Sequence, residues 1–158
     1  IYALVYGAGD AKIGSIVGGG NVEGRRLRNR FLNANPAFKD LVRHVKSAAS
    51  RGFLIGLDGR KLYVRSEHAA LNTLLQSAGA LICKKWALLT DQALKADGLD
   101  AEIISWVHDE LNLRVKKGQE EDVCNRLQES AKASGQAFSF KIPIDSEYHI
   151  GRNWSDVH

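Results

Sequence analysis

The chain has 158 residues, of which 44% are hydrophobic and 25% charged, a composition typical of a globular protein with one domain-sized unit. No apolar run approaches the roughly 20 residues of a membrane-spanning helix and no charged-then-apolar leader is visible, so a cytoplasmic protein without a membrane partner is expected. The formal net charge of +4 is unevenly distributed, because residues 25–65 hold eleven Lys and Arg against two Asp, a local +9 that leaves −5 elsewhere. That block is typical of a polyanion-binding face, although a solvated charged helix face would give the same pattern.

The start of the sequence predicts a longer parent protein. The chain contains no Met, and it begins with Ile1 inside an apolar, helix-like run that has no capping residue. We therefore expect the chain to be the carboxyl-terminal part of a larger polypeptide.

Helices are predicted over most of the first 49 residues. Tyr2 and Tyr6 are four apart and so share one helix face. The stretch Gly7–Gly9 ends that helix, and Asp10 is the expected cap of the next one. The helices expected after it cover residues 11–17, 21–33 and 36–49, the last beginning at Pro36.

The pattern becomes that of β-strands at residues 53–64, where Asp58-Gly59 separates two short apolar runs. This predicts a β-hairpin with a type I′ turn. Residues 67–97 then form the longest helical pattern, which Gly98 ends. One side of that helix carries imidazole and amide groups four residues apart: His68, Asn72 and Gln76.

Residues 104–115 predict a strand, a tight turn and a second strand. Asp109 and Glu110 lie side by side at the turn, where their charges repel. A solvated loop is the simple interpretation of two adjacent acids. The flanking strands are so apolar that we expect the turn at the floor of a cleft, where a hard divalent cation would offset the repulsion.

Two elements are expected after this hairpin. Residues 120–134 have one apolar face and predict a surface helix packed on a sheet. Residues 138–144 alternate between apolar and other side chains, which predicts a half-buried strand with Pro143 at a sheet edge. Cys83 and Cys124 lack metal-ligand spacing and are expected to be reduced thiols.

Four motifs in register resemble family A DNA polymerases, the DNA polymerase I family. Val107-His108-Asp109-Glu110 between apolar strands resembles motif C, and Tyr2-x-x-x-Tyr6-Gly7 resembles the end of motif B. Gly59-Arg60-Lys61 with His68-x-x-x-Asn72-x-x-x-Gln76 resembles the primer-template contact region. Gly151-Arg152-Asn153-Trp154 through His158 is similar to the carboxyl terminus in the short-tailed bacteriophage branch.

The resemblance implies an α+β fold that is a fragment of the right-hand polymerase. Residues 1–52 would be the remainder of the fingers subdomain. Residues 53–158 would be the carboxyl-terminal part of the palm, with the motif C hairpin, an antiparallel sheet and long helices. The implied function is template-directed nucleotidyl transfer from dNTP to a primer 3′-OH in viral DNA replication, with two Mg²⁺ ions.

Residue roles follow from the same resemblance. Asp109 would bind metal as a catalytic residue, Glu110 would act indirectly or as a weak ligand, and His108 would position the primer terminus. Tyr2 and Tyr6 would contact the incoming dNTP. The implied template and primer contacts are Gly7, Arg60, His68, Asn72 and Gln76, with amide donors suited to minor-groove acceptors that are nearly the same for every base pair.

Parts of the family's active site are missing from these residues. The motif A Asp, and the Arg and Lys that bind the triphosphate, would lie upstream of Ile1, so the chain alone is expected to be inactive. Expected partners are primer-template DNA, dNTP, the upstream part of the polymerase and a processivity factor bound elsewhere. Two alternatives remain open: a non-catalytic nucleic-acid-binding module that uses the basic block, and a metal-dependent nuclease that uses His108 and Asp109.

Overall fold

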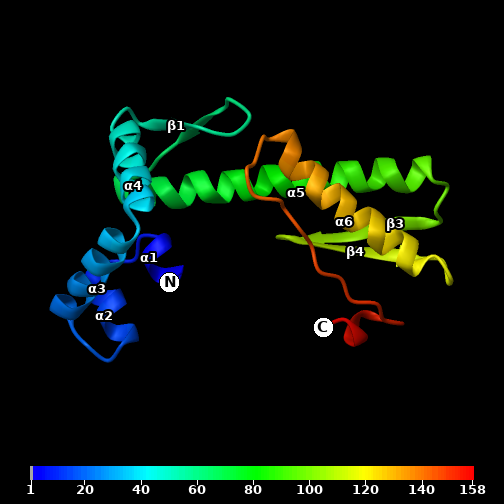
Figure 1. The fold of residues 1–158 in the computed structure, drawn as a ribbon, viewed down its shortest axis with the longest axis horizontal. Coiled ribbons are helices and arrows are strands. Elements are labelled where there is room, and N and C mark those ends of the chain that lie inside the picture. The colour runs from blue at the N-terminus through cyan, green and yellow to red at the C-terminus, as the bar shows by residue number, and fades with distance from the viewer. Residues whose placement is uncertain (1) are drawn as a thin grey trace. The chain divides into compact units, whose positions relative to one another are not determined.

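The computed structural model describes residues 2–158, and the chain divides into two compact units between Ala78 and Gly79. The helical start expected at Ile1 lies outside the described residues. Figure 1 traces the elements from blue at the N-terminus to red at the C-terminus. In order they are α1 (Tyr2–Val5), α2 (Asp10–Ile16), α3 (Asn21–Ala34), α4 (Pro36–Ala49), β1 (Phe53–Ile55), β2 (Lys61–Tyr63), η1 (Glu67–Ala69), α5 (Ala70–Ala96), β3 (Ala101–Val107), β4 (Glu110–Val115), α6 (Glu120–Ala137) and η2 (Trp154–Asp156).

In the first unit, α2 and α3 pack backbone against backbone. A Cβ added to Gly24 would lie 1.8 Å from the carbonyl oxygen of Asp10, and one added to Gly14 would lie 2.0 Å from that of Gly20. Only glycine leaves room for this approach. Beside the two helices, the apolar core of the unit joins α4, the β1–β2 hairpin and the first turns of α5 through Val45, Ala49, Leu54, Ala70 and Leu71.

The expected cap of α2 was wrong. The N-cap residue is Gly9, and Asp10 is the first residue of the helix. Its carboxylate lies 2.8 Å from Nε of Arg28 and 3.4 Å from Nε of Arg25, both on α3. The carboxylate therefore ties two helices together instead of accepting from its own helix terminus.

The β1–β2 hairpin is present, with Phe53 paired to Tyr63 and Ile55 to Lys61, but its expected type I′ turn was wrong. A type I′ turn needs a positive φ at both central residues. Gly59 has φ +79°, whereas Asp58 is not among the described residues with positive φ. The loop instead closes with Gly59 N donating to Gly56 O at 3.0 Å, while the Asp58 carboxylate accepts from the backbone N–H and guanidinium of Arg60.

In the second unit, β3 and β4 form the predicted antiparallel hairpin, in which Val107 pairs with Glu110 and Trp106 with Leu111. The register shifts between Ile103 and Ser105, so β3 is bulged at Ile104. Helix α6 is joined to α5 by the Trp86 indole, whose Nε1 donates to the carbonyl oxygen of Leu127 at 2.8 Å. The tight turn of the hairpin lies at one end of this sheet, after the pair Val107 and Glu110.

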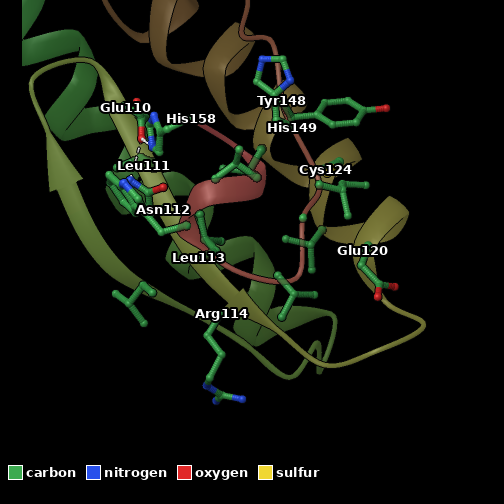
Figure 2. Close-up of a pocket in the computed structure, with 18 of the residues that line it drawn as sticks. Glu110, Leu111, Asn112, Leu113, Arg114, Glu120, Cys124, Tyr148, His149 and His158 are labelled. Atoms are coloured by element: carbon green, nitrogen blue, oxygen red, sulfur yellow. Dashed lines mark hydrogen bonds and ion pairs between the residues drawn. The ribbon is translucent and has the colours of Figure 1, made fainter.

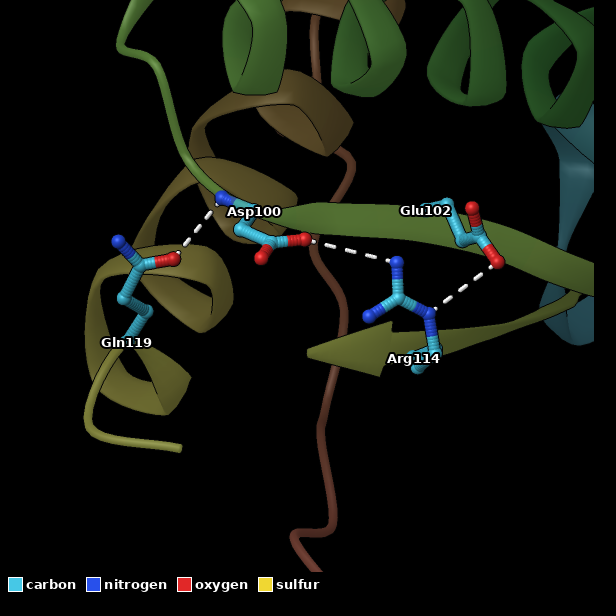
Figure 3. Close-up of polar contacts among 4 residues, drawn as sticks. All are labelled: Asp100, Glu102, Arg114 and Gln119. Atoms are coloured by element: carbon cyan, nitrogen blue, oxygen red, sulfur yellow. Dashed lines mark hydrogen bonds and ion pairs between the residues drawn. The ribbon is translucent and has the colours of Figure 1, made fainter. Parts of the chain in front are cut away.

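Polar contacts hold the other end of the β3–β4 hairpin (Figure 3). The Arg114 guanidinium lies 3.2 Å from a carboxylate oxygen of Glu102 and 3.5 Å from one of Asp100. The backbone N–H of Asp100 donates to the side chain of Gln119 at 2.9 Å. The Arg114 side chain is half exposed, so these contacts fix register more than they add stability.

The strand expected over residues 138–144 was wrong. After α6 the backbone turns, because Phe138 N and Phe140 N both donate to Gly135 O and Ser139 takes a positive φ of +56°. Residues 141–150 contain no strand. Ile144 instead packs against Gly135, where an added Cβ would lie 2.6 Å from Ile144 Cγ1. Alternating side chains make a strand only where a neighbouring strand can pair.

Helices and two small antiparallel sheets give the expected α+β class. Among residues 2–158, no helix combines the length and the apolar character that crossing a bilayer requires.

Candidate functional site

The turn of the β3–β4 hairpin consists of His108 and Asp109 alone, since Val107 and Glu110 already pair. His108 has φ +54°, an unusual value for a residue with a side chain. Both turn residues are exposed in this chain, so the cleft floor expected around them is not formed by the described residues. Within residues 2–158, the Asp109 carboxylate has no hydrogen bond or ion pair, since the side-chain contacts of this turn involve Trp106, Glu110 and their partners.

Glu110, in contrast, is held by the protein. Its Oε1 accepts from Nδ2 of Asn112 at 2.7 Å and lies 3.0 Å from Nε2 of His158 (Figure 2). The His158 ring stacks on Trp154, with ring centroids 4.0 Å apart. Asn112 was not among the predicted site residues, although strand alternation places it on the same face as Glu110.

The Glu110–His158 pair borders a cavity of about 720 Å³ between β4, α6 and residues 147–158. Figure 2 shows Leu111, Leu113 and Cys124 among its lining residues together with the exposed Tyr148 and His149. Asp109 does not line it. This cavity is therefore distinct from the unpaired carboxylate at the turn.

The donor type at the turn fits a hard divalent cation, but the number of donors does not complete a site. Mg²⁺ prefers carboxylate and other oxygen ligands, and Asp109 supplies an exposed carboxylate. Among residues 2–158, no three His, Cys, Asp or Glu side chains gather closely enough to hold a metal ion. A cation at Asp109 would need further ligands from outside these residues.

Cys83 and Cys124 are free thiols, as expected. Burial raises the pKa of both, and nearby carboxylates add to the effect. For Cys83 on α5 the carboxylate is that of Asp109, so this thiol senses the charge at the turn. Raised pKa values keep both cysteines protonated and poorly reactive near neutral pH.

The residues expected to bind dNTP lie together in the first unit. The Tyr2 and Tyr6 rings stack with centroids 6.4 Å apart and planes 12° from parallel, and they are 81% and 43% exposed. Gly7 follows with φ +74°, and a Cβ there would lie 3.3 Å from the carbonyl oxygen of His68. The fold thus brings the glycine that ends the first helix against the start of the polar stripe.

That stripe lies on η1 and the first turns of α5. His68 and Gln76 are exposed, whereas Asn72 is half-buried. The Asn72 Oδ1 atom is buried without a hydrogen-bond partner among the described residues. Arg60, the other expected DNA contact, is paired with Asp58, which raises the pKa of Arg60 and lowers that of Asp58.

Several cations of the basic block at residues 25–65 are paired with acids, so fewer of them are available to a ligand than the sequence suggests. Asp10 and Glu23 precede residue 25 but pair with arginines inside the block, as Asp40 and Asp58 also do. Arg28 is the most engaged, because it also donates to the Ala8 carbonyl and its side chain is only 31% exposed. Six cations of the block have no acidic partner within residues 2–158: Arg30, Lys39, Lys46, Arg51, Lys61 and Arg65.

Comparisons with known proteins agree with the motifs. The model of DNA polymerase family A matches residues 1–156. The DNA-directed DNA polymerases of Enterobacteria phage T3 and Escherichia phage T7 are 38% and 39% identical to the chain over 180 residues, covering 100% of it and 26% of each relative. DNA polymerase I of Pseudomonas aeruginosa is 29% identical, covering 99% of the chain and 18% of the relative. The chain is thus more similar to these phage proteins and spans about a quarter of their length.

A solved structure has the same fold. It is described as the POL domain of Pol1 from M. smegmatis in complex with DNA primer-template and dNTP. The TM-score is 0.87 at 24% sequence identity, and the match covers 99% of this chain and 29% of the other. The expected fold, a fragment of the right-hand polymerase, is confirmed by this match.

Proposed function

The chain belongs to DNA polymerase family A, and on this premise we propose that it forms part of a DNA-directed DNA polymerase. That enzyme adds nucleotides from dNTP to a primer 3′-hydroxyl on a DNA template in viral DNA replication. The names of the phage relatives support this activity. Since the chain spans about a quarter of their length, we propose that it acts only with the remaining part of the polymerase.

One observation carries the proposal: the unpaired carboxylate of Asp109 at an exposed two-residue turn, next to a Glu110 that the protein itself holds. Asp109 is exposed, so its carboxylate can reach a cation that has its other ligands outside this chain. Asp109 therefore has the character of a ligand, and Glu110 that of a group that acts indirectly.

We assign Asp109 as a ligand of two Mg²⁺ ions, together with a second carboxylate from polypeptide outside this chain. The bound ions would make the primer hydroxyl a better nucleophile and offset charge on the triphosphate. His108, beside Asp109, positions the primer terminus. Asn112 and His158 keep Glu110 in one orientation and so limit its freedom to compete with Asp109 for the cations.

The first unit supplies the substrate contacts in this proposal. The exposed, stacked Tyr2 and Tyr6 rings bind the incoming dNTP, and Gly7 lets the template pass close to the backbone. The stripe of His68, Asn72 and Gln76, with Arg60 nearby in sequence, contacts the primer-template duplex. Residues 1–52 then correspond to fingers and residues 53–158 to palm.

The test is Asp109→Asn in the complete polymerase that carries this chain. Loss of a cation ligand removes several kcal/mol of transition-state stabilisation, so kcat for primer extension should fall at least about a hundredfold. The affinity for primer-template should change by less than about threefold, since other residues of the polymerase make the contacts to the DNA phosphates. The matched control is Asp100→Asn, an exposed acid at the other end of the same hairpin, which should retain full activity.

The same experiment separates the alternatives. A non-catalytic DNA-binding module predicts that Asp109→Asn leaves extension unchanged, and that result would overturn the proposal. A nuclease predicts that the purified chain alone cleaves DNA with Mg²⁺. We expect neither cleavage nor primer extension by the chain alone.

A further inference from the structure

Trp106 contacts the backbone of the turn that carries Asp109. It precedes Val107, the last residue of β3, and its indole Nε1 donates to the carbonyl oxygen of His108 at 2.8 Å. Trp106 is 43% exposed, so this bond lies beside solvent. No backbone N–H within residues 2–158 donates to the same oxygen.

The turn needs such a bond because its backbone is strained. His108 occupies the first position of a two-residue turn with φ +54°, and Asp109 does not share a positive φ. This φ pattern is that of a type II′ turn, whose first position normally holds glycine. A residue with a Cβ is strained in that backbone conformation, so contacts with neighbouring groups must hold the turn in place.

The bond acts directly on Asp109. The His108 carbonyl and the Asp109 N–H belong to one planar peptide unit. A donor that fixes the carbonyl therefore also fixes the orientation of the peptide plane that leads into Asp109. Functional groups must be held within about 0.5 Å of their productive position, and a rigid strand is a better support than a free turn.

From this geometry we propose that Trp106 is a positioning residue for Asp109: its indole N–H fixes the His108–Asp109 peptide and thereby aims the Asp109 carboxylate. The proposal rests on the function assigned above to Asp109. It concerns how that carboxylate is held, whereas the Asp109→Asn experiment asks whether the carboxylate is used at all.

The structure offers a matched control. Trp86 also donates its indole N–H to a main-chain carbonyl at 2.8 Å, but that carbonyl belongs to Leu127 on α6. Trp106→Phe and Trp86→Phe each remove one such bond and keep an aromatic ring. In the complete polymerase, kcat should fall about ten- to a hundredfold for Trp106→Phe, because small misplacements at a reacting centre are costly. Trp86→Phe should change kcat less than about threefold, and KM for dNTP should be little changed in both.

A second pair tests the donor rather than the ring. In Gln the amide nitrogen is separated from Cα by as many bonds as the indole nitrogen of Trp, and Met has the same length without a donor. Trp106→Gln should recover most of the lost kcat, while Trp106→Met should not. Mn²⁺ binding measured by calorimetry without DNA or dNTP should weaken severalfold in Trp106→Met and Trp106→Phe and recover in Trp106→Gln.

The outcomes are separable from those of the proposed function. If Asp109→Asn abolishes extension but Trp106→Phe matches Trp86→Phe in kcat and Mn²⁺ affinity, the positioning role is wrong and the polymerase assignment stands. Equal behaviour of the Gln and Met variants, including failure of both to fold, would assign Trp106 to packing and overturn the proposal. If Asp109→Asn retains full extension, the polymerase assignment itself fails.

Discussion

The imidazole Nε2 of His158 lies 3.0 Å from Oε1 of Glu110, the same oxygen that accepts a hydrogen bond from Asn112 at 2.7 Å (Figure 2). One partner comes from the same strand as Glu110 and the other from a segment 48 positions further along the chain. The carboxylate next to Asp109 is therefore held both locally and by tertiary structure.

Because Asn112 and His158 contact the same oxygen of Glu110, we expect each to compensate for loss of the other. Asn112→Ala and His158→Ala should each lower kcat of the complete polymerase only about two- to fivefold, because the other partner still orients Glu110. Together they should lower it more than the product of the single effects, with a coupling energy of about 0.5–1.5 kcal/mol. Steady-state kinetics of the four proteins measures this.

The control for that cycle is His149, which lines the same cavity without an ion pair to Glu110 among the described residues. Asn112→Ala combined with His149→Ala should be additive. Additive behaviour of the Asn112–His158 pair as well would show that the two contacts do not share a role.

The raised pKa of Cys83 predicts a pH effect that reports on the turn. A raised pKa means less thiolate at a given pH, and removing the Asp109 charge removes the smaller of its two causes, burial being the larger. With EDTA present, Asp109→Asn should move the pH profile of Cys83 alkylation to lower pH and raise its rate at pH 8 by up to about threefold. Mass spectrometry after iodoacetamide treatment gives the rate at each cysteine.

Cys124 is the internal control for this experiment. Its pKa is raised by burial and by Glu120 and Glu121, so its alkylation profile should be the same in both proteins. A Cys83 profile that does not move would show that the Asp109 charge is too well screened to act at that distance.

The space around two helical glycines, Gly24 in the first unit and Gly79 at the start of the second, predicts opposite effects of an alanine substitution. An alanine Cβ at Gly24 would meet backbone atoms, the nearest 1.8 Å away, so α2 and α3 must separate. Gly24→Ala should cost more than about 3 kcal/mol, in the range of severe overpacking. At Gly79 nothing lies within 4 Å of an added Cβ, and Gly79→Ala in the interior of α5 should stabilise by about 0.5–1 kcal/mol.

Thermal unfolding of the complete polymerase measures both changes. The midpoint should fall clearly for Gly24→Ala and stay or rise for Gly79→Ala. An unchanged midpoint for Gly24→Ala would mean that the two helices adjust without loss, contrary to their backbone contact.

Local signals in the sequence were sufficient for most elements. The apolar periods predicted α3, α5, α6 and the β3–β4 hairpin, and Gly98, with φ +65°, ends its helix as expected. These features depend on contacts and backbone preferences within a few residues, which a sequence displays directly. The motifs that carry the family resemblance are equally local, and the match to the family model agrees with them.

Tertiary structure decided what each polar group is paired with. Asp10 binds two arginines of α3 instead of capping α2, and Glu110 meets His158, whereas Asp109 beside it has no partner within the described residues. The alternating segment 138–144 formed no strand because no neighbouring strand pairs with it there. Sequence alone determined which residues could form helices, strands and a charged turn. Partner choice was left to the fold, because ion pairs and strand pairing depend on distances between groups far apart along the chain.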